Sequence, residues 1–274
     1  MIEKNNIYCM DCLEGMKQLP DNFVDLTVTS PPYDNLRKYN GFVFDFENIA
    51  KELFRITKKG GVVVWVVGDA TIDGSETGTS FKQALYFKEI GFNLHDTMIY
   101  QKNPYVPLNH NRYEQEFEYM FVLSKGKPNV FNPLKIPCIE AGKEKSFSYK
   151  CGTTNENSSM RSGMDRVVKI KDFKTKGNIW LFGVGQGRSA KDKIAFEHPA
   201  IFPEQLALDH ILSWSNKGDL VFDPMCGSGT TLKMAKYSNR DFLGFDISQE
   251  YCNISKRRLE QNTLVEKELQ GVEK

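Results

Sequence analysis

Residues 219–232 read Asp-Leu-Val-Phe-Asp-Pro-Met-Cys-Gly-Ser-Gly-Thr-Thr-Leu, and this segment gives the clearest indication of the architecture. Its apolar start predicts a short buried strand ending at Asp223, and the residues after Gly229 predict a helix that ends at Tyr237. Gly227 and Gly229 have no side chains and let a ligand approach the backbone closely, while the helix start offers unpaired N–H groups. A strand, a Gly-x-Gly turn and a helix form half of a nucleotide site in an α/β sheet.

The rest of the chain alternates between the same two patterns. Short apolar runs predict strands at residues 7–11, 25–29, 62–67, 94–101, 117–124 and 242–246. Apolar residues at helical spacing, with start signals such as Pro203 and Ser248, predict helices at residues 44–56, 81–91, 203–218 and 249–261. Strands that alternate with helices predict an α/β fold with a mostly parallel sheet covered by helices.

One segment breaks this alternation. From about Pro133 to Arg188 the periodicity fades into Gly, Ser, Asn and Lys, which predicts an inserted loop-rich module rather than more sheet. Residues 135–193 hold thirteen Lys/Arg against six Asp/Glu, a net charge of +7, whereas the rest of the chain carries −6. Such a segment favours binding to the phosphate backbone of double-stranded DNA, although a solvated insertion has the same composition.

Composition excludes several classes of protein. The 274 residues are 40% apolar and 26% charged, as in ordinary globular proteins. No apolar run reaches the roughly 20 residues of a membrane helix, and the N-terminus lacks the apolar core of a secretion signal, so we expect a cytoplasmic protein without membrane contact. The six cysteines show no disulfide framework and the four histidines complete no zinc site, so we expect free thiols and no metal.

Two acids define the charge of the expected nucleotide site. Asp223 precedes the glycine turn, and Asp246 ends the next predicted strand, where it could accept hydrogen bonds from two ribose hydroxyls. The turn lacks the third glycine of the dinucleotide fingerprint and the lysine of a phosphate-binding loop. A carboxylate at the mouth of the turn repels phosphates but favours a cation. S-adenosylmethionine, with its ammonium and sulfonium, fits this charge.

A second motif, Thr29-Ser-Pro-Pro-Tyr33, follows the strand predicted at residues 25–29. Its prolines fix the backbone, its aromatic ring could stack on a flat heterocycle, and its hydroxyl and carbonyl groups could accept hydrogen bonds from an exocyclic amine. The motif therefore indicates chemistry on the amino group of a base.

Together these motifs resemble a known family. Thr29–Tyr33, Asp223–Thr230 and Phe242–Asp246 are similar to motifs of the amino-group DNA methyltransferases of bacteria and their phages, which modify cytosine N4 or adenine N6. The catalytic motif comes before the cofactor loop, which is the order of the permuted β group. The resemblance implies a Rossmann-like methyltransferase fold with a catalytic half at residues 1–132, a target-recognition region at residues 133–195 and a cofactor-binding half at residues 196–274.

The resemblance also implies a role for each matching residue. The catalytic tip would consist of Ser30, Pro31, Pro32 and Tyr33. The residues that bind S-adenosylmethionine would be Asp11 at the adenine amine, Asp223 near the ammonium, Asp246 at the ribose, Phe202 and Glu204 at the opposite wall, and Gly227, Ser228, Gly229 and Thr230 around the methionine part. For DNA contacts we expect Arg161, Arg166 and Arg188, because guanidinium groups suit bases and phosphates.

An amine conjugated into an aromatic ring is a poor nucleophile because its lone pair is delocalised. The family's mechanism implies that the Ser30 hydroxyl and the Pro31 carbonyl localise this lone pair by accepting hydrogen bonds, after the base has been flipped out of the duplex. A serine at the first position of the tip favours cytosine N4, and adenine N6 is the alternative.

Other functions stay open at this point. A C5-cytosine methyltransferase needs a nucleophilic thiolate, for which Cys138 is a poorly placed candidate. A catalytically silent DNA-binding relative, or a methyltransferase acting on RNA or protein amines, would share some of the motifs. The sequence also leaves open a cognate restriction endonuclease and a homodimer.

Overall fold

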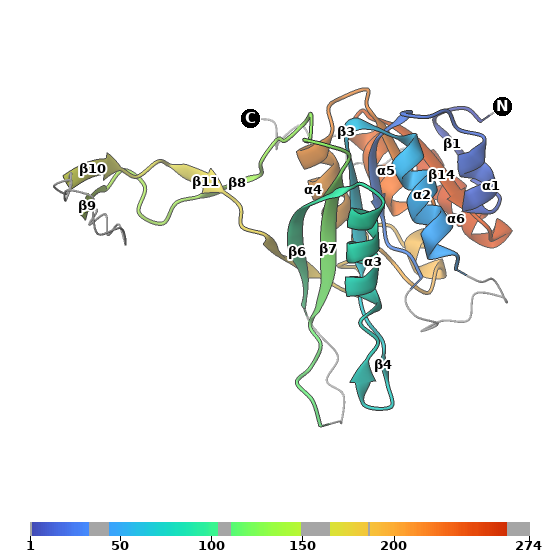
Figure 1. Ribbon diagram of the computed structural model, residues 1–274, viewed down its shortest axis with the longest axis horizontal. Coiled ribbons are helices and arrows are strands. Elements are labelled where there is room, and N and C mark those ends of the chain that lie inside the picture. The colour runs from blue at the N-terminus through green and yellow to red at the C-terminus, as the bar shows by residue number, and fades with distance from the viewer. Residues whose placement is uncertain (1, 33–43, 104–110, 149–164, 186, 262–274) are drawn as a thin grey trace. The chain divides into compact units, whose positions relative to one another are not determined.

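The computed structural model describes residues 2–32, 44–103, 111–148, 165–185 and 187–261 (Figure 1). The chain divides into two compact units. The first consists of Met1–Asn132 and Asn178–Lys274, and the second of Pro133–Gly177. None of the helices in the described part of the chain is both long and apolar enough to cross a membrane.

The first unit is built on an eight-stranded sheet with the order β1-β14-β13-β2-β3-β7-β6-β12. In that order its strands are Asn6–Cys9, Asp241–Asp246, Leu220–Asp223, Val24–Thr29, Thr57–Val67, Phe117–Ser124, Asn93–Asn103 and Ile179–Gly183. Only β7 runs against its neighbours, because its pairings with β3 and β6 are antiparallel and every other pairing in the sheet is parallel. The mostly parallel α/β sheet predicted from the sequence is confirmed.

Helices cover both faces of this sheet (Figure 1). One layer contains α1 (Cys12–Lys17), α2 (Phe46–Ile56) and α3 (Thr79–Glu89). The other layer contains α4 (Glu204–Trp214), α5 (Thr230–Tyr237) and α6 (Gln249–Glu260). Ser248 caps α6 by accepting a hydrogen bond from the Tyr251 N–H, as the sequence predicted.

Strand β3 is buried on both faces, which explains its continuous apolar run. Residues Val62–Val67 are at most 1% exposed. Side chains alternate along a strand, so Val63, Trp65 and Val67 face the core beneath α2 and α3, and the other three face the opposite layer. The Trp65 Nε1–H donates to Gln83 of α3 at 2.8 Å, which satisfies its one buried donor.

The sheet has a topological switch point between β2 and β13. From β2 the chain passes through α2 to β3 on one side, and from β13 it passes through α5 to β14 on the other. Leu26 pairs with Val221 and Thr27 with Phe222, so both strands reach the same edge. Ligands of open α/β sheets bind in the crevice beyond such a point. Ser30 and Asp223, from motifs almost two hundred residues apart, therefore meet at one crevice.

One predicted boundary was wrong. The sequence predicted that residues 58–61 separate α2 from a strand that begins at Val62, whereas β3 begins at Thr57, directly after α2 ends at Ile56. The side chain of Lys125, at the end of β7, binds the last turn of α2. Its ammonium donates to the carbonyls of Phe54 (2.8 Å) and Thr57 (2.9 Å). A distant cation thus satisfies carbonyls that a terminal glycine otherwise would.

A second prediction also fails. Residues 133–188 were expected to add no strand to the sheet, but β12 pairs in parallel with β6. Trp180 and Phe182 of β12 are buried, whereas Ile179 and Leu181 on its other face are exposed. Residues 178–195 therefore fold with the first unit, although the predicted recognition region included them.

The described part of the second unit contains two short antiparallel strand pairs, and in the sequence one pair lies between the two strands of the other. Strands β8 (Lys135–Pro137) and β11 (Phe173–Thr175) pair antiparallel, as do β9 (Glu144–Ser148) and β10 (Asp165–Lys169). The sequence of this unit holds ten Lys/Arg and five Asp/Glu, so it retains most of the basic charge noted above. A small hairpin in the first unit joins β4 (Thr71–Ile72) to β5 (Ser75–Glu76).

Candidate active site

A cleft opens at the carboxyl edge of the sheet, beyond the switch point. Its volume is about 2010 Å³. This exceeds the roughly 300–1,000 Å³ typical of a site for one drug-sized ligand. The predicted residues that line it are Asp11, Ser30, Pro31, Pro32, Phe202, Asp223, Gly227, Ser228, Thr230 and Asp246. All of them belong to the first unit, and the volume of the cleft leaves room for two adjacent ligands.

The glycine loop has a shape that side chains would not allow. Gly227 and Gly229 have φ angles of +50° and +74°, in the left-handed region. A Cβ on Gly229 would lie 2.7 Å from the Ser255 hydroxyl oxygen, and one on Gly227 would lie 3.1 Å from His198 Nε2. Gly229 also stands at the N-cap position of α5, so the loop leads directly into a helix start.

Asp246 fixes this loop from the end of β14. Its Oδ2 accepts a hydrogen bond from the Gly227 N–H at 2.8 Å, and its Oδ1 accepts one from the Ser248 N–H at 2.8 Å. Burial raises the pKa of this carboxyl, and the two backbone donors partly oppose that effect. A carboxylate has further lone pairs, so Asp246 can also accept from a ligand hydroxyl in the cleft.

Asp223 is the more deeply buried acid and is 5% exposed. Its Oδ1 accepts hydrogen bonds from the Thr29 hydroxyl at 2.7 Å and from the Met225 N–H at 3.2 Å. Burial raises the pKa of Asp223 to about 6, and the hydrogen bonds only partly oppose it. A buried carboxylate without a cation beside it is costly, so this position favours a positively charged ligand.

The catalytic tip lies directly after β2. Ser30, Pro31 and Pro32 line the cleft, with Pro31 buried. The Val28 carbonyl accepts a hydrogen bond from the Thr231 hydroxyl of α5 at 3.1 Å. The strand that carries the tip is thus bonded to both sides of the glycine loop. Tyr33 lies outside the described residues.

Asp11 caps the helix α1 at the far side of the cleft. Its Oδ1 accepts from the Leu13 N–H at 2.8 Å and from the Glu14 N–H at 3.3 Å. The side chain is exposed and belongs to the cleft wall. Helix capping uses Oδ1, and the contact of Asp11 with the adenine amine stays a prediction.

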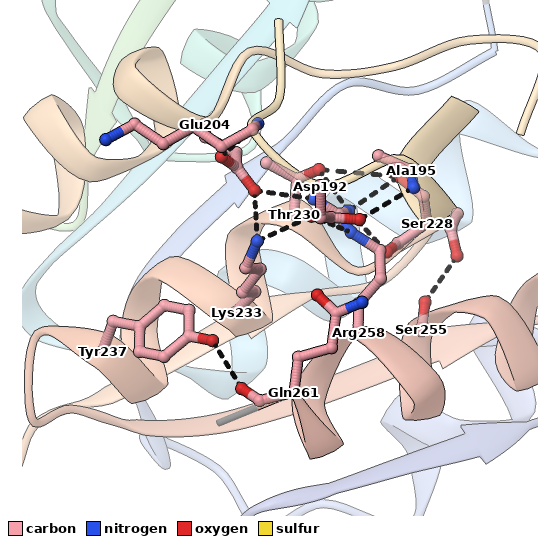
Figure 2. Close-up of polar contacts among 12 residues, drawn as sticks. Asp192, Ala195, Glu204, Ser228, Thr230, Lys233, Tyr237, Ser255, Arg258 and Gln261 are labelled. Carbon is pink, nitrogen blue, oxygen red and sulfur yellow. Dashed lines mark hydrogen bonds and ion pairs between the residues drawn. The ribbon is translucent and has the colours of Figure 1, made fainter. Parts of the chain in front are cut away.

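Two predicted cofactor residues do not line the cleft. Gly229 shapes the loop from behind. Glu204 lies in a buried group of charges, where its Oε1 accepts from Lys233 at 2.6 Å and from Arg258 at 2.8 Å (Figure 2). No sequence pattern pointed to these partners, because an acid in the first turn of a helix is already favourable on its own.

Other wall residues were not predicted as site residues. The segment from Asp192 to Glu204, which we call the strap, contributes Phe196 to the wall, which was not predicted, and also residues 198–203, which lie in the segment that resembles a cofactor-lining motif of the family and include the predicted Phe202. The His198 ring packs edge-on against Tyr251, with centroids 4.2 Å apart. Thr29 and Thr231 were also missed, since a threonine in a strand or helix carries no signal of its own.

The predicted DNA contacts are placed only in part. Arg188 is exposed in a turn beside Gly185 and Ser189, which are wall residues of the cleft. Arg166 lies on β10 in the second unit. Arg161 lies outside the described residues.

No described thiol is suited to attack a base. Cys138 belongs to the second unit and is not part of the cleft wall. Two cysteines do line the cleft, but burial raises the pKa of Cys12 to about 12 and that of Cys226 well above its ordinary value. Both stay protonated at neutral pH, which argues against C5 chemistry.

Comparison with known proteins identifies this arrangement. The DNA methylase family N6_N4_Mtase matches residues 24–257. The chain belongs to this family. It is 54% identical over 258 residues to the orphan methyltransferase M.BamHII of Bacillus amyloliquefaciens, covering 93% of this chain and 96% of that one. It is 28% identical over 261 residues to the type II methyltransferase M.BglII of Bacillus subtilis, covering 92% and 68%.

Solved structures share the fold of this DNA methylase. The PvuII cytosine-N4-specific DNA methyltransferase has a TM-score of 0.69 at 20% identity, covering 99% of this chain and 92% of that one. A putative DNA modification methylase of Thermus thermophilus, solved with S-adenosyl-L-methionine, has a TM-score of 0.61 at 24% identity, covering 93% and 92%. The family and fold predicted from the motifs are confirmed.

Proposed function

We propose that this DNA methyltransferase of the N6/N4 amino family transfers a methyl group from S-adenosylmethionine to N4 of a cytosine flipped out of double-stranded DNA. The observation that carries the proposal is the shared cleft. The Ser30–Pro32 tip and the acids Asp223 and Asp246 meet at one switch point. A base amine held at the tip would face a cofactor held at the acids.

The described residues fit the cofactor. Asp223 would pair with its ammonium, which compensates a buried carboxylate whose pKa lies near 6. Asp246 would accept from the ribose hydroxyls, and Asp11 from the adenine amine. The loop at Gly227, Ser228 and Thr230 would surround the methionine part, and Phe202 would pack against it from the strap. The bound cofactor supplies an electrophilic methyl group.

The chain's own residues prepare the amine. The Ser30 hydroxyl and the Pro31 carbonyl accept hydrogen bonds from its two N–H groups, which draws the nitrogen toward tetrahedral geometry and localises its lone pair. Positioning of the two reactants provides most of the remaining rate enhancement, because the amine must approach the methyl carbon in line with the departing sulfur. The methylated amine would release one proton to water, through the Ser30 hydroxyl that accepts its hydrogen bond, and the electron pair of the broken carbon–sulfur bond would stay on the sulfur. Tyr33 would stack on the ring throughout.

DNA would be bound by both units. The basic residues of Pro133–Gly177, including Arg161 and Arg166, would contact phosphates and bases of the target sequence. Arg188 would contact the backbone next to the flipped nucleotide, because it is exposed beside the cleft wall. A cognate endonuclease, a homodimer and a cytoplasmic location remain predictions from the sequence.

One experiment tests the reaction and the base. The purified protein is incubated with plasmid DNA from a host without its own methylases and with methyl-labelled S-adenosylmethionine, and the DNA is digested to nucleosides for mass spectrometry. We expect N4-methylcytosine, and none with Ser30→Ala. N6-methyladenine would replace the proposed base, C5-methylcytosine would overturn the chemistry, and DNA binding without label would indicate a silent relative.

A further inference from the structure

Four buried charges form a closed group behind the cofactor loop (Figure 2). Lys233 of α5 lies 2.6 Å from both Asp192 and Glu204. Arg258 of α6 lies 3.1 Å from Asp192 and 2.8 Å from Glu204. The Arg258 side chain is 0% exposed and that of Lys233 is 2% exposed. Each cation therefore pairs with both acids out of contact with solvent.

In both Asp192 and Glu204, one carboxylate oxygen binds the two cations and the other accepts a hydrogen bond from a backbone N–H. Oδ2 of Asp192 and Oε1 of Glu204 accept from the two cations. Oδ1 of Asp192 accepts from the Ala195 N–H at 2.9 Å, and Oε2 of Glu204 accepts from the Lys191 N–H at 3.1 Å. In each acid, one oxygen thus fixes the backbone near that end of the strap. The other oxygen connects the same end to Lys233 of α5 and Arg258 of α6.

These acids are the two ends of the strap itself. Residues 196 and 198–203 between them line the cleft, whereas Asp192 and Glu204 do not. The strap also approaches the loop closely, since a Cβ on Gly227 would lie only 3.1 Å from Nε2 of His198. Anchoring both ends therefore sets the position of the wall that faces the cofactor loop.

Arg258 holds the loop at the same time. Its Nη1 donates to the Ser228 carbonyl at 2.7 Å, to the Ser228 hydroxyl at 3.1 Å and to the Thr230 hydroxyl at 2.9 Å. Its Nε donates to Asp192 and its Nη2 to Glu204. All three nitrogens of one planar group are engaged, a pattern that the single ammonium of lysine cannot reproduce.

We propose that Arg258, together with Lys233 and Glu204, is a positioning device for the cofactor: it fixes the strap and the glycine loop against each other, and so sets the affinity for S-adenosylmethionine. This inference rests on the proposed function for the identity of the ligand. None of these three side chains lines the cleft, so they act on the ligand through Ser228, Thr230 and the strap. Their loss should weaken cofactor binding and leave DNA binding unchanged.

The chain offers matched controls on the same elements. Arg257 is the neighbour of Arg258 on α6, and it pairs at 2.7 Å with Glu197 at the surface, where the two side chains are 51% and 46% exposed. Arg257→Lys, which keeps the charge opposite Glu197, and Glu260→Gln, at an exposed position of α6, repeat the chemical changes of Arg258→Lys and Glu204→Gln without touching the buried group or replacing a residue of the strap. If only the buried pair of variants loses cofactor affinity, the loss is due to the location of these residues in the buried group and not to the chemical change alone.

Calorimetric titration of full-length protein with S-adenosylmethionine and S-adenosylhomocysteine gives the decisive numbers. For Arg258→Lys we expect Kd and KM for the cofactor to rise about tenfold or more, because several charge-assisted bonds are lost together. The kcat at saturating cofactor and the KM for DNA should change little. The amides of the strap should exchange hydrogen faster. The surface variants should behave as wild type.

Glu204→Gln gives a second measurement if Arg258→Lys does not fold. It keeps the shape of the side chain and its bond to the Lys191 N–H, and we expect a smaller defect of the same kind. In the double variant Arg258→Lys/Glu204→Gln, the losses of cofactor affinity should not add, since both substitutions disrupt the same buried group of charges. Unchanged cofactor affinity in the folded variants, with only a lower melting temperature, would overturn the proposal.

The outcomes also separate this proposal from the proposed function. Wild-type protein that binds the cofactor but leaves DNA unmodified contradicts the function alone, and the binding comparison still decides the role of Arg258. Wild-type protein that binds no S-adenosylmethionine contradicts both.

Discussion

Thr29 donates its hydroxyl to the buried carboxylate of Asp223 at 2.7 Å, across 194 residues of sequence. Thr29 is the last residue of β2 and directly precedes the Ser30 tip, and Asp223 ends β13. One hydrogen bond therefore joins the strand that carries the proposed base-binding tip to the acid that is proposed to pair with the cofactor. In the proposed reaction the methyl group would pass from the cofactor beside Asp223 to the base at Ser30, so this bond would fix the relative position of the two partners.

Replacing Thr29 by valine tests this link. The variant keeps the shape of the side chain but removes a hydrogen bond to a charged group, an interaction that contributes roughly 1.5–3 kcal/mol. We expect cofactor affinity to fall about tenfold to a hundredfold, with a loss of kcat as well, measured by calorimetry and steady-state kinetics at pH 8. Unchanged affinity and rate would show that the two strands are aligned without this bond.

Thr27 lies two residues earlier on the same strand. Replacing it by valine should stabilise the protein, whereas replacing Thr29 should weaken cofactor binding. Thr27 is 0% exposed, and its hydroxyl has no hydrogen-bond partner among the described residues. Thr27→Val removes a buried polar atom that costs roughly 1–3 kcal/mol, so thermal unfolding should occur at a higher temperature. Cofactor affinity should not change, which makes this variant the control for Thr29→Val. A lower melting temperature would indicate a partner outside the described residues.

Cofactor binding should depend on pH through Asp223. Burial raises the pKa of this carboxyl to about 6, and only the ionised form attracts an ammonium. Below pH 6 we expect the dissociation constant of S-adenosylmethionine to rise by up to about tenfold per pH unit, as protonation competes with binding. In Asp223→Asn the affinity for S-adenosylmethionine should be low at every pH and should no longer fall below pH 6. A flat profile for the wild type would show that Asp223 does not meet the cation.

The same group predicts a cost to stability without ligand. The folded pKa of about 6 lies above the ordinary value of 3.8, so the folded state binds this proton more tightly. Stability from this group therefore falls as pH rises from 3.8 to 6, and the full loss, roughly 3 kcal/mol, applies above pH 6. Cofactor-free Asp223→Asn should thus unfold at a higher temperature than wild type at pH 7, in a calorimetric scan. Equal melting temperatures would contradict the pKa shift.

Much of the fold could be predicted because many element ends are set by nearby residues. Strand β7 and helix α5 have the predicted bounds, Phe117–Ser124 and Thr230–Tyr237. Gly229 supplies the positive φ before α5, and a Lys-Gly turn follows β7. Prediction failed at Ile179–Gly183, where a short apolar run stands among glycines and lysines and only its pairing with β6 makes it a strand.

The site could be predicted as far as parallel strands bring motifs together. Ser30, Asp223 and Asp246 each follow or end a parallel strand, so they had to share one edge. The supporting residues could not be found in this way. Glu204 meets Lys233 and Arg258, which are 29 and 54 residues further along, and no local pattern encodes such a meeting.

Lys125 gives a final test of a contact that the sequence conceals. Its ammonium donates to the carbonyls of Phe54 and Thr57 and lies 4.7 Å from the centre of the Phe54 ring. Burial lowers the pKa of this lysine, and the nearby charge of Asp21 only partly opposes that effect. Lys125→Met keeps the length of the side chain but leaves the end of α2 without its donor, so we expect a loss of roughly 1–3 kcal/mol in the free energy of unfolding, measured by urea titration.

Lys127→Met is the control. Lys127 is exposed and lies two residues away, so its substitution should leave the free energy of unfolding in urea almost unchanged. Equal effects of the two substitutions would mean that the helix end is stable without Lys125.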